Sequence, residues 1–389
     1  MRHVSRICAD LVAIRSENPP GRTDEVIEYI RAFLESTGIN AAVSGNAGGM
    51  NNLVTCGPGK KLLLCGHVDV VPALDNGWTK SPFSGIIDDR YVYGRGATDM
   101  KGGCASILSA CEMLADQDLG IPATLAFVCD EETGGENGIR RLLADKAITP
   151  CDCIIAEPTP ARHPSIGQKG LLRLDLEFTG RPAHGSLYPA VGVSAIMEAM
   201  QFLISVKELH EREYPVDEHL REIIDQSSAV LAKEFSLDGV QNILRSLTFN
   251  PGTITGGEKS NVVAQRCKLE LELRVPWGCH IPALITDLTA RAENGRITAQ
   301  ESHEPSITLP DTPLVQLTCE AIASVYGGSV FPIVQWAASD ARHLRKYGFN
   351  VIEYGPGELT LLHAIDERVR IESLEKAVEV YRTVMRGYV

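Results

Sequence analysis

The chain has 389 residues, of which 44% are hydrophobic and 22% charged, so it holds enough apolar material for more than one globular core. Its formal net charge is −13 and no basic run interrupts the acidic balance, which argues against a nucleic-acid partner. No segment has the length of a membrane span, and residues 1–10 lack the apolar stretch of a signal peptide. We therefore expect a cytoplasmic protein of two domains that does not enter a membrane.

The eleven cysteines are scattered and show no repeated spacing. Cys65, Cys129 and Cys153 lie inside apolar runs, where a reduced cysteine behaves as a small hydrophobic residue. Cys151 and Cys153 form one CxC pair, which is a weak metal motif without a second cysteine pair. The cysteines are therefore interpreted as core thiols and not as a disulfide framework.

The first predicted element is a helix that begins after Thr23. Asp24 and Glu25 favour a helix N-terminus, and an apolar stripe with helical spacing runs through residues 26–34. Gly38 can end the helix.

Short apolar runs follow and alternate with helical stretches such as residues 105–115. The runs predicted to be buried strands are residues 61–65, 124–129, 153–156 and 350–354. This alternation predicts an α/β fold with a mixed, mainly parallel sheet and helices on both of its faces.

The pattern changes near Gly170. Residues 171–178 and 268–274 alternate apolar and polar side chains with period two, which is typical of antiparallel strands with one solvated face. A helix at about residues 194–209 and a charged, helical segment at residues 211–245 lie between these strands.

These features predict that a smaller α+β domain is inserted into the first domain. The helix that starts near Thr312 returns the chain to the first domain, which would comprise residues 1–171 and 307–389. The inserted domain would comprise residues 172–306. We assign no role to the charged segment within it.

Acidic residues or histidines follow the predicted strands or lie in nearby turns. The residues in question are His67, Asp69, Asp99, Asp130, Glu131, Glu132, Glu157 and His363. Each one alone is more often a turn residue or a solvated surface group. However, several carboxylates at one sheet edge repel one another unless cations neutralise them, and a mixed set with histidine suits zinc or a related divalent ion.

With these motifs the chain resembles the zinc metallopeptidase and deacylase family of succinyl-diaminopimelate desuccinylase, acetylornithine deacetylase, aminoacylase and glutamate carboxypeptidase. The resemblance extends from residue 18 to residue 363. It implies two Zn²⁺ ions per subunit, for which Co²⁺ or Mn²⁺ can substitute, and a homodimer. The implied ligands are His67, Asp99 and Glu157 for one ion and Asp99, Glu132 and His363 for the other, so that Asp99 bridges both.

The resemblance also implies how the site works. Glu131 would be the general base that moves a proton from the metal-activated water to the leaving amine. Asp69 would accept the free ring N–H of His67 and fix its orientation. The Asp99–Met100 peptide would be cis.

Further residues are implied to complete the site. His184, in the motif at residues 181–186, would reach from one subunit into the site of its partner. Asn261, Arg274 and Ser339 would hold the substrate. The alternatives for these three are a turn cap, an exposed strand residue and a helix cap, respectively.

The expected activity is hydrolysis of the amide bond of an N-acyl amino acid in amino-acid biosynthesis. Lys169 stands where desuccinylases carry an arginine, and it would offer a succinyl carboxylate a point charge in place of a bidentate fork. The alternatives are a dipeptidase or carboxypeptidase acting on a short peptide and, more remotely, an inactive binding homologue. The presence of all five ligands together with the base argues against an inactive homologue.

Overall fold

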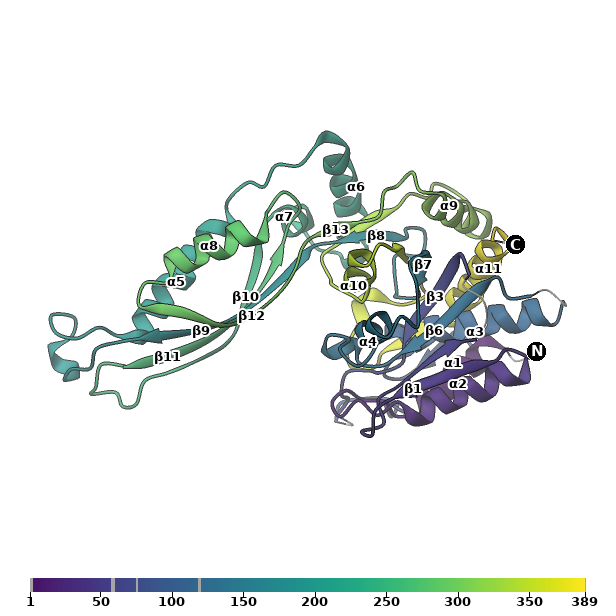
Figure 1. Cartoon of the computed structure of the whole chain (residues 1–389), viewed down its shortest axis with the longest axis horizontal. Coiled ribbons are helices and arrows are strands. Elements are labelled where there is room, and N and C mark those ends of the chain that lie inside the picture. The colour runs from purple at the N-terminus through teal and green to yellow at the C-terminus, as the bar shows by residue number, and fades with distance from the viewer. Residues whose placement is uncertain (1–2, 57–59, 75, 118–119, 389) are drawn as a thin grey trace.

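The computed structural model describes residues 3–56, 60–74, 76–117 and 120–388. Figure 1 shows a larger part, which holds both ends of the chain, and an elongated lobe that extends from it. In the part of the chain that the structure describes, no helix combines the length and the apolar composition needed to cross a membrane.

A mixed sheet forms the centre of the larger part. Among the described residues it has nine strands, with β1, β2, β6, β3, β7, β15, β8 and β13 in spatial order and β14 paired with β8. The strands are β1 (Ala41–Gly45), β2 (Asn51–Thr55), β3 (Leu62–His67), β6 (Ala123–Val128), β7 (Asp152–Ile155), β8 (Ser165–Gln168), β13 (Ser306–Ile307), β14 (Ile333–Gln335) and β15 (Asn350–Glu353). The central strands β6, β3, β7 and β15 are parallel, as predicted.

Helices cover this sheet in two groups (Figure 1). The first group consists of α1 (Val4–Ala13), α2 (Asp24–Ser36), α3 (Gly102–Ala115), α9 (Pro313–Tyr326) and α11 (Ile371–Arg386). The second group consists of α4 (Ile139–Ala144) and α10 (Ala341–Lys346), which pack against each other on the opposite face of the sheet. The predicted α/β class with helices on both faces is therefore confirmed.

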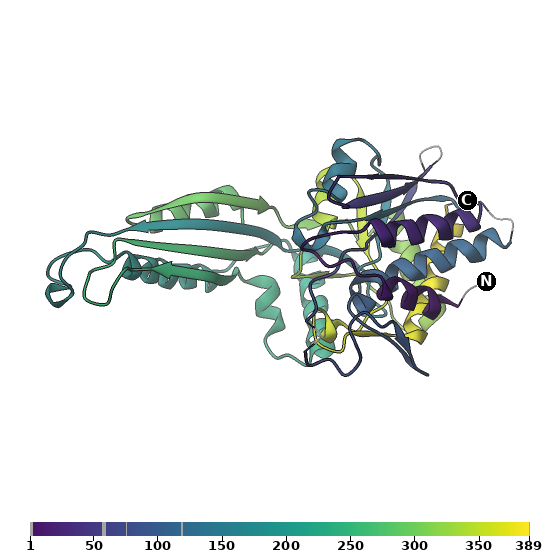
Figure 2. The same ribbon diagram turned by 90° about the horizontal axis from the view of Figure 1, so that it is seen from below.

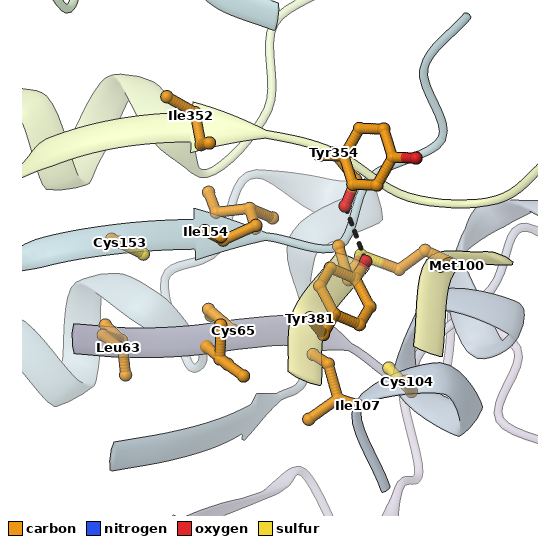
Figure 3. Close-up of a cluster of buried hydrophobic side chains, with 14 of the residues drawn as sticks. Leu63, Cys65, Met100, Cys104, Ile107, Cys153, Ile154, Ile352, Tyr354 and Tyr381 are labelled. Carbon is orange, nitrogen blue, oxygen red and sulfur yellow. Dashed lines mark hydrogen bonds between the residues drawn. The ribbon is translucent and has the colours of Figure 1, made fainter. Parts of the chain in front are cut away.

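The core between sheet and helices is continuous from β3 to α11 (Figure 3). Cys65 of β3, Cys153 of β7 and Ile352 of β15 are all buried there. Tyr381 of α11 donates a hydrogen bond of 2.6 Å to the carbonyl oxygen of Tyr354, so the helix is fixed to the end of β15. All eleven cysteines are free thiols, and burial raises the pKa of Cys65 and Cys153.

A small antiparallel sheet joins two segments that are distant in sequence. It consists of β4 (Ile86–Ile87), β5 (Tyr91–Tyr93) and β16 (Arg368–Arg370), in the order β16, β5, β4. Because β5 leads into the glycine-rich turn around Asp99, this pairing brings the segment after His363 beside that turn.

The lobe is built on a four-stranded antiparallel sheet with the order β10, β11, β9, β12. Its elements are β9 (Gly170–Thr179), β10 (Thr248–Gly256), β11 (Arg266–Val275), β12 (Gly295–His303), α5 (Ala195–His210) and α8 (Ile281–Arg291). The strands run along the length of the lobe (Figure 2). Leu172, Leu174 and Leu176 are buried against the two helices, while alternate side chains of β9 are exposed, which is the predicted period-two pattern.

The charged segment folds into two helices, α6 (Glu218–Phe235) and α7 (Val240–Arg245). Their buried side chains, among them Ile224, Leu231 and Leu244, belong to the core of the larger part and not to that of the lobe. Ser227 of α6 also accepts a hydrogen bond of 2.9 Å from the amide of Val334 in β14. The segment thus packs on the central sheet although it lies in sequence between the strands of the lobe.

Candidate metal centre

The predicted ligands gather at one edge of the central sheet. His67 ends β3, and Glu157 follows β7 by two residues. Glu131 and Glu132 lie in a short 3-10 helix, η2 (Glu131–Thr133), just after β6. Because β6, β3 and β7 are parallel neighbours, their carboxyl ends meet at the same edge.

Two further ligands come from loops. Asp99 lies in the turn η1 (Ala97–Lys101), and its peptide bond to Met100 is cis, as the resemblance implied. His363 follows the 3-10 helix η4 (Leu359–Leu361) and is half exposed. The structure therefore brings all five predicted ligands together.

Asp99 lies between the two histidines. One carboxylate oxygen, Oδ1, is 3.1 Å from Nε2 of His67, and the other, Oδ2, is 3.1 Å from Nε2 of His363. His67 Nε2 is also 3.6 Å from Glu157, and His363 Nε2 is 3.4 Å from Glu132. His67 is thus close to Glu157, His363 is close to Glu132, and Asp99 lies between the two histidines. The division of these residues between two metal ions stays a prediction.

The donor atoms fit bound divalent cations. The set His67, Asp99, Glu132 and the set His67, Glu131, Glu157 each have ligand atoms within 4.8 Å of one another. Within the described residues, Oε1 of Glu132 is buried and has no hydrogen-bond partner, which leaves a lone pair for a metal ion. Imidazole and carboxylate together are ligands for zinc and related ions.

The electrostatics show what a cation would neutralise. Burial, with the charge of a neighbouring carboxylate, raises the pKa of Glu131, Glu132 and Glu157. Burial also favours the neutral form of Asp99, but hydrogen bonds to His363 and His67 outweigh it and lower the pKa of this carboxyl. Several acids in one dry site are costly unless positive charge balances them.

The ring of His67 is held in one orientation. Its Nδ1 lies 2.9 Å from the carbonyl oxygen of Asp69, which can only accept a hydrogen bond, so Nδ1 carries a hydrogen and Nε2 is the ring atom directed at the site. The carboxylate of Asp69 is farther from Nδ1, at 3.6 Å. The main-chain oxygen is therefore the nearer partner of the ring.

The carboxylate of Asp69 has other partners. It accepts hydrogen bonds of 3.2 Å from the amides of both Glu131 and Glu132, and one of 3.0 Å from the side chain of Asn18. Asp69 thus fixes the backbone of the two glutamates as well as lying beside His67.

Glu131 has the environment of a proton carrier. Burial raises its pKa, and the carboxyl of Asp340 adds to the effect, while Arg342 at 3.9 Å and His67 oppose it. Burial of a carboxyl group favours its protonated form, and a general base must take up a proton and release it again.

Two residues that support the site were not predicted from the sequence. Glu367 is fully buried and pairs with Arg95 at 2.5 Å. Its carboxylate also accepts hydrogen bonds from the main-chain amides of Thr98 and Asp99. Arg95 in turn donates to the carbonyl oxygen of His363 at 3.1 Å. The only signal for Arg95 was its place in the glycine-rich turn before Asp99, and Glu367 had none, because its position depends on the pairing of β16 with β5.

A cavity of about 300 Å³ opens onto the metal-ligand cluster. Arg274 and Ser339 line it, as expected of substrate-binding residues. Arg274 also pairs with Glu272 at 2.7 Å, and the hydroxyl of Ser339 hydrogen-bonds to buried Glu353. The structure thus brings two of the three predicted substrate-binding residues to the site.

His184 and Asn261 do not reach this cavity within the single chain. They lie beside each other in the lobe, where His184 precedes η3 (Gly185–Leu187) and the amide of Gly185 donates to the carbonyl of Asn261 at 2.8 Å. Both side chains are exposed. A second cavity, of about 490 Å³, lies next to them and is lined by Gly185 and Ser260 among others, none of them a predicted metal ligand.

Lys169 does not face the cavity. Its ammonium group is buried and donates to the carbonyl oxygens of Ile243 and Ser246, both at 2.7 Å, and to the hydroxyl of Thr248 at 3.2 Å. These carbonyls lie at the end of α7. The lysine therefore anchors this helix.

Comparisons with known proteins show which family the chain is similar to. A model of peptidase family M20/M25/M40 matches residues 63–387. A succinyl-diaminopimelate desuccinylase of Methylobacterium radiotolerans is 30% identical over 349 residues, covering 85% of this chain and 81% of that protein. An acetylornithine deacetylase of Vibrio parahaemolyticus is 27% identical over 377 residues, covering 94% of this chain and 91% of that protein.

The fold agrees as well. An M20 family metallo-carboxypeptidase from Sulfolobus solfataricus superimposes with a TM-score of 0.81 at 20% identity, covering 100% of this chain and 99% of that one. With the family model matching most of the chain, and with the predicted ligands gathered at one sheet edge, the chain belongs to peptidase family M20/M25/M40.

Proposed function

We propose that the chain hydrolyses the amide bond of an N-acyl amino acid and uses two divalent metal ions per subunit, with zinc as the first choice. One ion would be held by His67, Asp99 and Glu157, and the other by Asp99, Glu132 and His363. The observation on which this rests is the position of Asp99, whose two oxygens each lie 3.1 Å from a different histidine.

Bound at this place, the ions would supply a water of lowered pKa and polarise the scissile carbonyl. The side chain of Glu131 takes the proton from the attacking water and passes it to the leaving nitrogen. The carboxylate of Asp69 keeps Glu131 and Glu132 in position by accepting hydrogen bonds from both of their main-chain amides. The main-chain carbonyl of Asp69 keeps Nε2 of His67 directed at the site.

The substrate would be held from two sides. Arg274 is placed to bind the carboxylate of the amino acid, and Ser339 lies on the same cavity wall. We further propose that residues 172–306, apart from α6 and α7, which pack in the core of the larger part, form a lid and dimerisation domain inserted into a catalytic domain of residues 1–171 and 307–389. In a homodimer, His184 of one subunit would donate a hydrogen bond to the developing oxyanion in the site of the other, with Asn261 beside it.

A substrate panel with a metal control tests this proposal. The purified protein is assayed with N-acetyl and N-succinyl amino acids and with dipeptides, before and after treatment with a chelator and after addition of Zn²⁺, Co²⁺ or Mn²⁺. We expect hydrolysis of at least one N-acyl amino acid, its loss with the chelator and its return with metal. Cleavage of dipeptides alone would favour the peptidase alternative, and full activity in excess chelator would exclude the proposed chemistry.

A further inference from the structure

The cavity over the metal-ligand cluster has one apolar wall. The side chains that form it are Leu231 and Phe235 from α6, Trp336 after β14, and Leu359 and Leu362 from the segment before His363. Two of these five come from the charged segment to which the sequence assigned no role. Helix α6 is amphipathic, and its apolar side faces the body of the protein while its charged side faces solvent.

The wall is a fixed part of the body. The rings of Phe235 and Trp336 pack with their centroids 5.2 Å apart. Ser227 holds the middle of α6 to β14, and Lys169 holds the end of α7 through two carbonyl oxygens. Phe235 and Trp336 are partly exposed, while Leu231 is only 2% exposed and supports the wall from the core. A substrate group that enters the cavity therefore meets a preformed apolar surface.

The charges of the cavity limit what else a substrate can carry. Among the described residues that line it, Arg274 is the one cation apart from the metal ligand His363. Three of the carboxylates are the proposed metal ligands, Glu131 is the proposed base, and the fifth, Glu353, is fully buried and already bonded to Ser165, Gln335 and Ser339. The cavity therefore offers one site for a carboxylate and no free acid for a substrate ammonium group.

We propose that α6 makes this enzyme selective for substrates that carry one carboxylate and one uncharged apolar substituent, which packs on Phe235 of α6 and its neighbour Trp336. This inference rests on the proposed amide hydrolysis and adds the class of substrate. An apolar amino-acid side chain and an apolar acyl chain share this chemistry. A second charged group, such as an ornithine ammonium, would lie against the wall without a partner.

The test compares substrates of nearly equal shape. N-acetyl-norleucine and N-acetyl-ornithine differ at the end of the side chain, where one has a methyl group and the other an ammonium group. We expect kcat/KM to be at least 10-fold higher for norleucine, since a single group in an apolar pocket changes specificity by about 10–200-fold. Comparison of kcat/KM for N-pentanoyl-glycine and N-acetyl-glycine tests the acyl chain in the same way. The pair of substrates with the larger ratio of kcat/KM shows whether the amino-acid side chain or the acyl chain contacts the wall.

Variants of α6 connect the preference to this helix. Phe235→Glu places a carboxylate in the wall and is expected to lower the norleucine to ornithine ratio of kcat/KM at least 10-fold. Leu231→Ala should reduce the ratio of kcat/KM for the pair of substrates whose substituent contacts the wall. Leu220→Ala is the matched control, because Leu220 lies on the same helix and packs on the same core but does not line the cavity. The ratio is insensitive to partial misfolding, since both substrates report the same active fraction.

The outcomes separate the two proposals. The role of α6 is wrong if kcat/KM is equal for N-acetyl-ornithine and N-acetyl-norleucine and if the norleucine to ornithine ratio of Phe235→Glu equals that of the Leu220→Ala control. The proposal of amide hydrolysis would then still stand. If no N-acyl amino acid is hydrolysed by metal-loaded protein, the proposed function fails, and the substrate class fails with it.

Discussion

Glu131 and Glu132 are adjacent in sequence but have different surroundings. Glu132 lies 3.4 Å from His363 and has a buried oxygen without a partner among the described residues, as expected of a metal ligand. Glu131 faces Arg342 at 3.9 Å, and burial raises its pKa. However, Glu131 also lies within ligand distance of His67 and Glu157, so its role as base and not as ligand stays a prediction.

Substitution of each glutamate separates the two roles. Glu131→Ala should lower turnover by about 10²–10⁴-fold, the usual contribution of a general base, while two metal ions stay bound. Glu132→Ala should also weaken the second metal site, by about 10-fold or more. Metal analysis alongside kcat measures both effects. If Glu131→Ala loses an ion and Glu132→Ala keeps both, the assignments are reversed.

At this scale the sequence predicted the ligands better than their supports. His67, Glu132 and Glu157 follow predicted strands, and parallel strands place such residues at a common edge. Glu367 could not be found in this way, because it reaches Asp99 only through the pairing of β16 with β5. Asp69 was expected to accept the ring N–H of His67, and the nearer acceptor is its carbonyl oxygen at 2.9 Å, with the carboxylate at 3.6 Å.

Among the elements, α6 and α7 were predicted as helical but not placed correctly. Amphipathic spacing shows that a helix has a buried side, but it does not show which core receives that side. The segment lies in sequence between the strands of the lobe, and nonetheless Ile224 and Leu231 pack in the core of the larger part. Very short strands such as β13 and β14 were not predicted, since two or three residues carry no periodic pattern.

Lys169 gives this helical segment a measurable pH dependence. Burial, with the nearby guanidinium of Arg274 adding to it, lowers the pKa of Lys169 from its ordinary 10.5 to about 7 in the folded protein. Between these two values the unfolded chain binds a proton that the folded chain does not. The contribution of Lys169 to the free energy of unfolding therefore rises with pH across this window and is lost as the pH falls through 7.

The comparison of wild type with Lys169→Met tests this effect. We expect the free energy of unfolding of the wild type to increase more steeply, or decrease less steeply, between pH 7 and pH 9.5 than that of the variant. Denaturant titrations at several pH values measure the difference in the free energy of unfolding between the two proteins. The ionisation of other groups contributes equally to both and cancels in this difference. Parallel curves for the two proteins would show that Lys169 keeps its charge in the fold.

For the whole molecule, the alternation of strands and helices predicted the α/β sheet, and the period-two strands predicted the lobe. The proposed contribution of the lobe to the active site involves a second subunit. His184 and Asn261 are exposed on the lobe and do not line the metal-site cavity. A second subunit would be needed to bring them there, and the sequence indicated this only by resemblance.

Mixing of subunits tests the role of His184. A His184→Ala chain is combined with a Glu131→Ala chain, each of which forms an impaired homodimer. If His184 acts across the interface, one of the two sites in each mixed dimer contains both groups and the other contains neither, and activity reappears. Loss of the oxyanion donor alone should cost about 10²–10³-fold in turnover. Verified mixed dimers that stay as inactive as their parents would show that His184 does not serve the partner subunit.

The central claim is that Asp99 holds two metal ions between His67 and His363, and the number of bound ions tests it most directly. Elemental analysis of wild-type protein, loaded with zinc and freed of excess metal, should give two ions per chain. Asp99→Ala, which removes the shared ligand, should give fewer than two under the same conditions. A wild-type value of one ion or none after full metal supplementation would contradict the two-metal site.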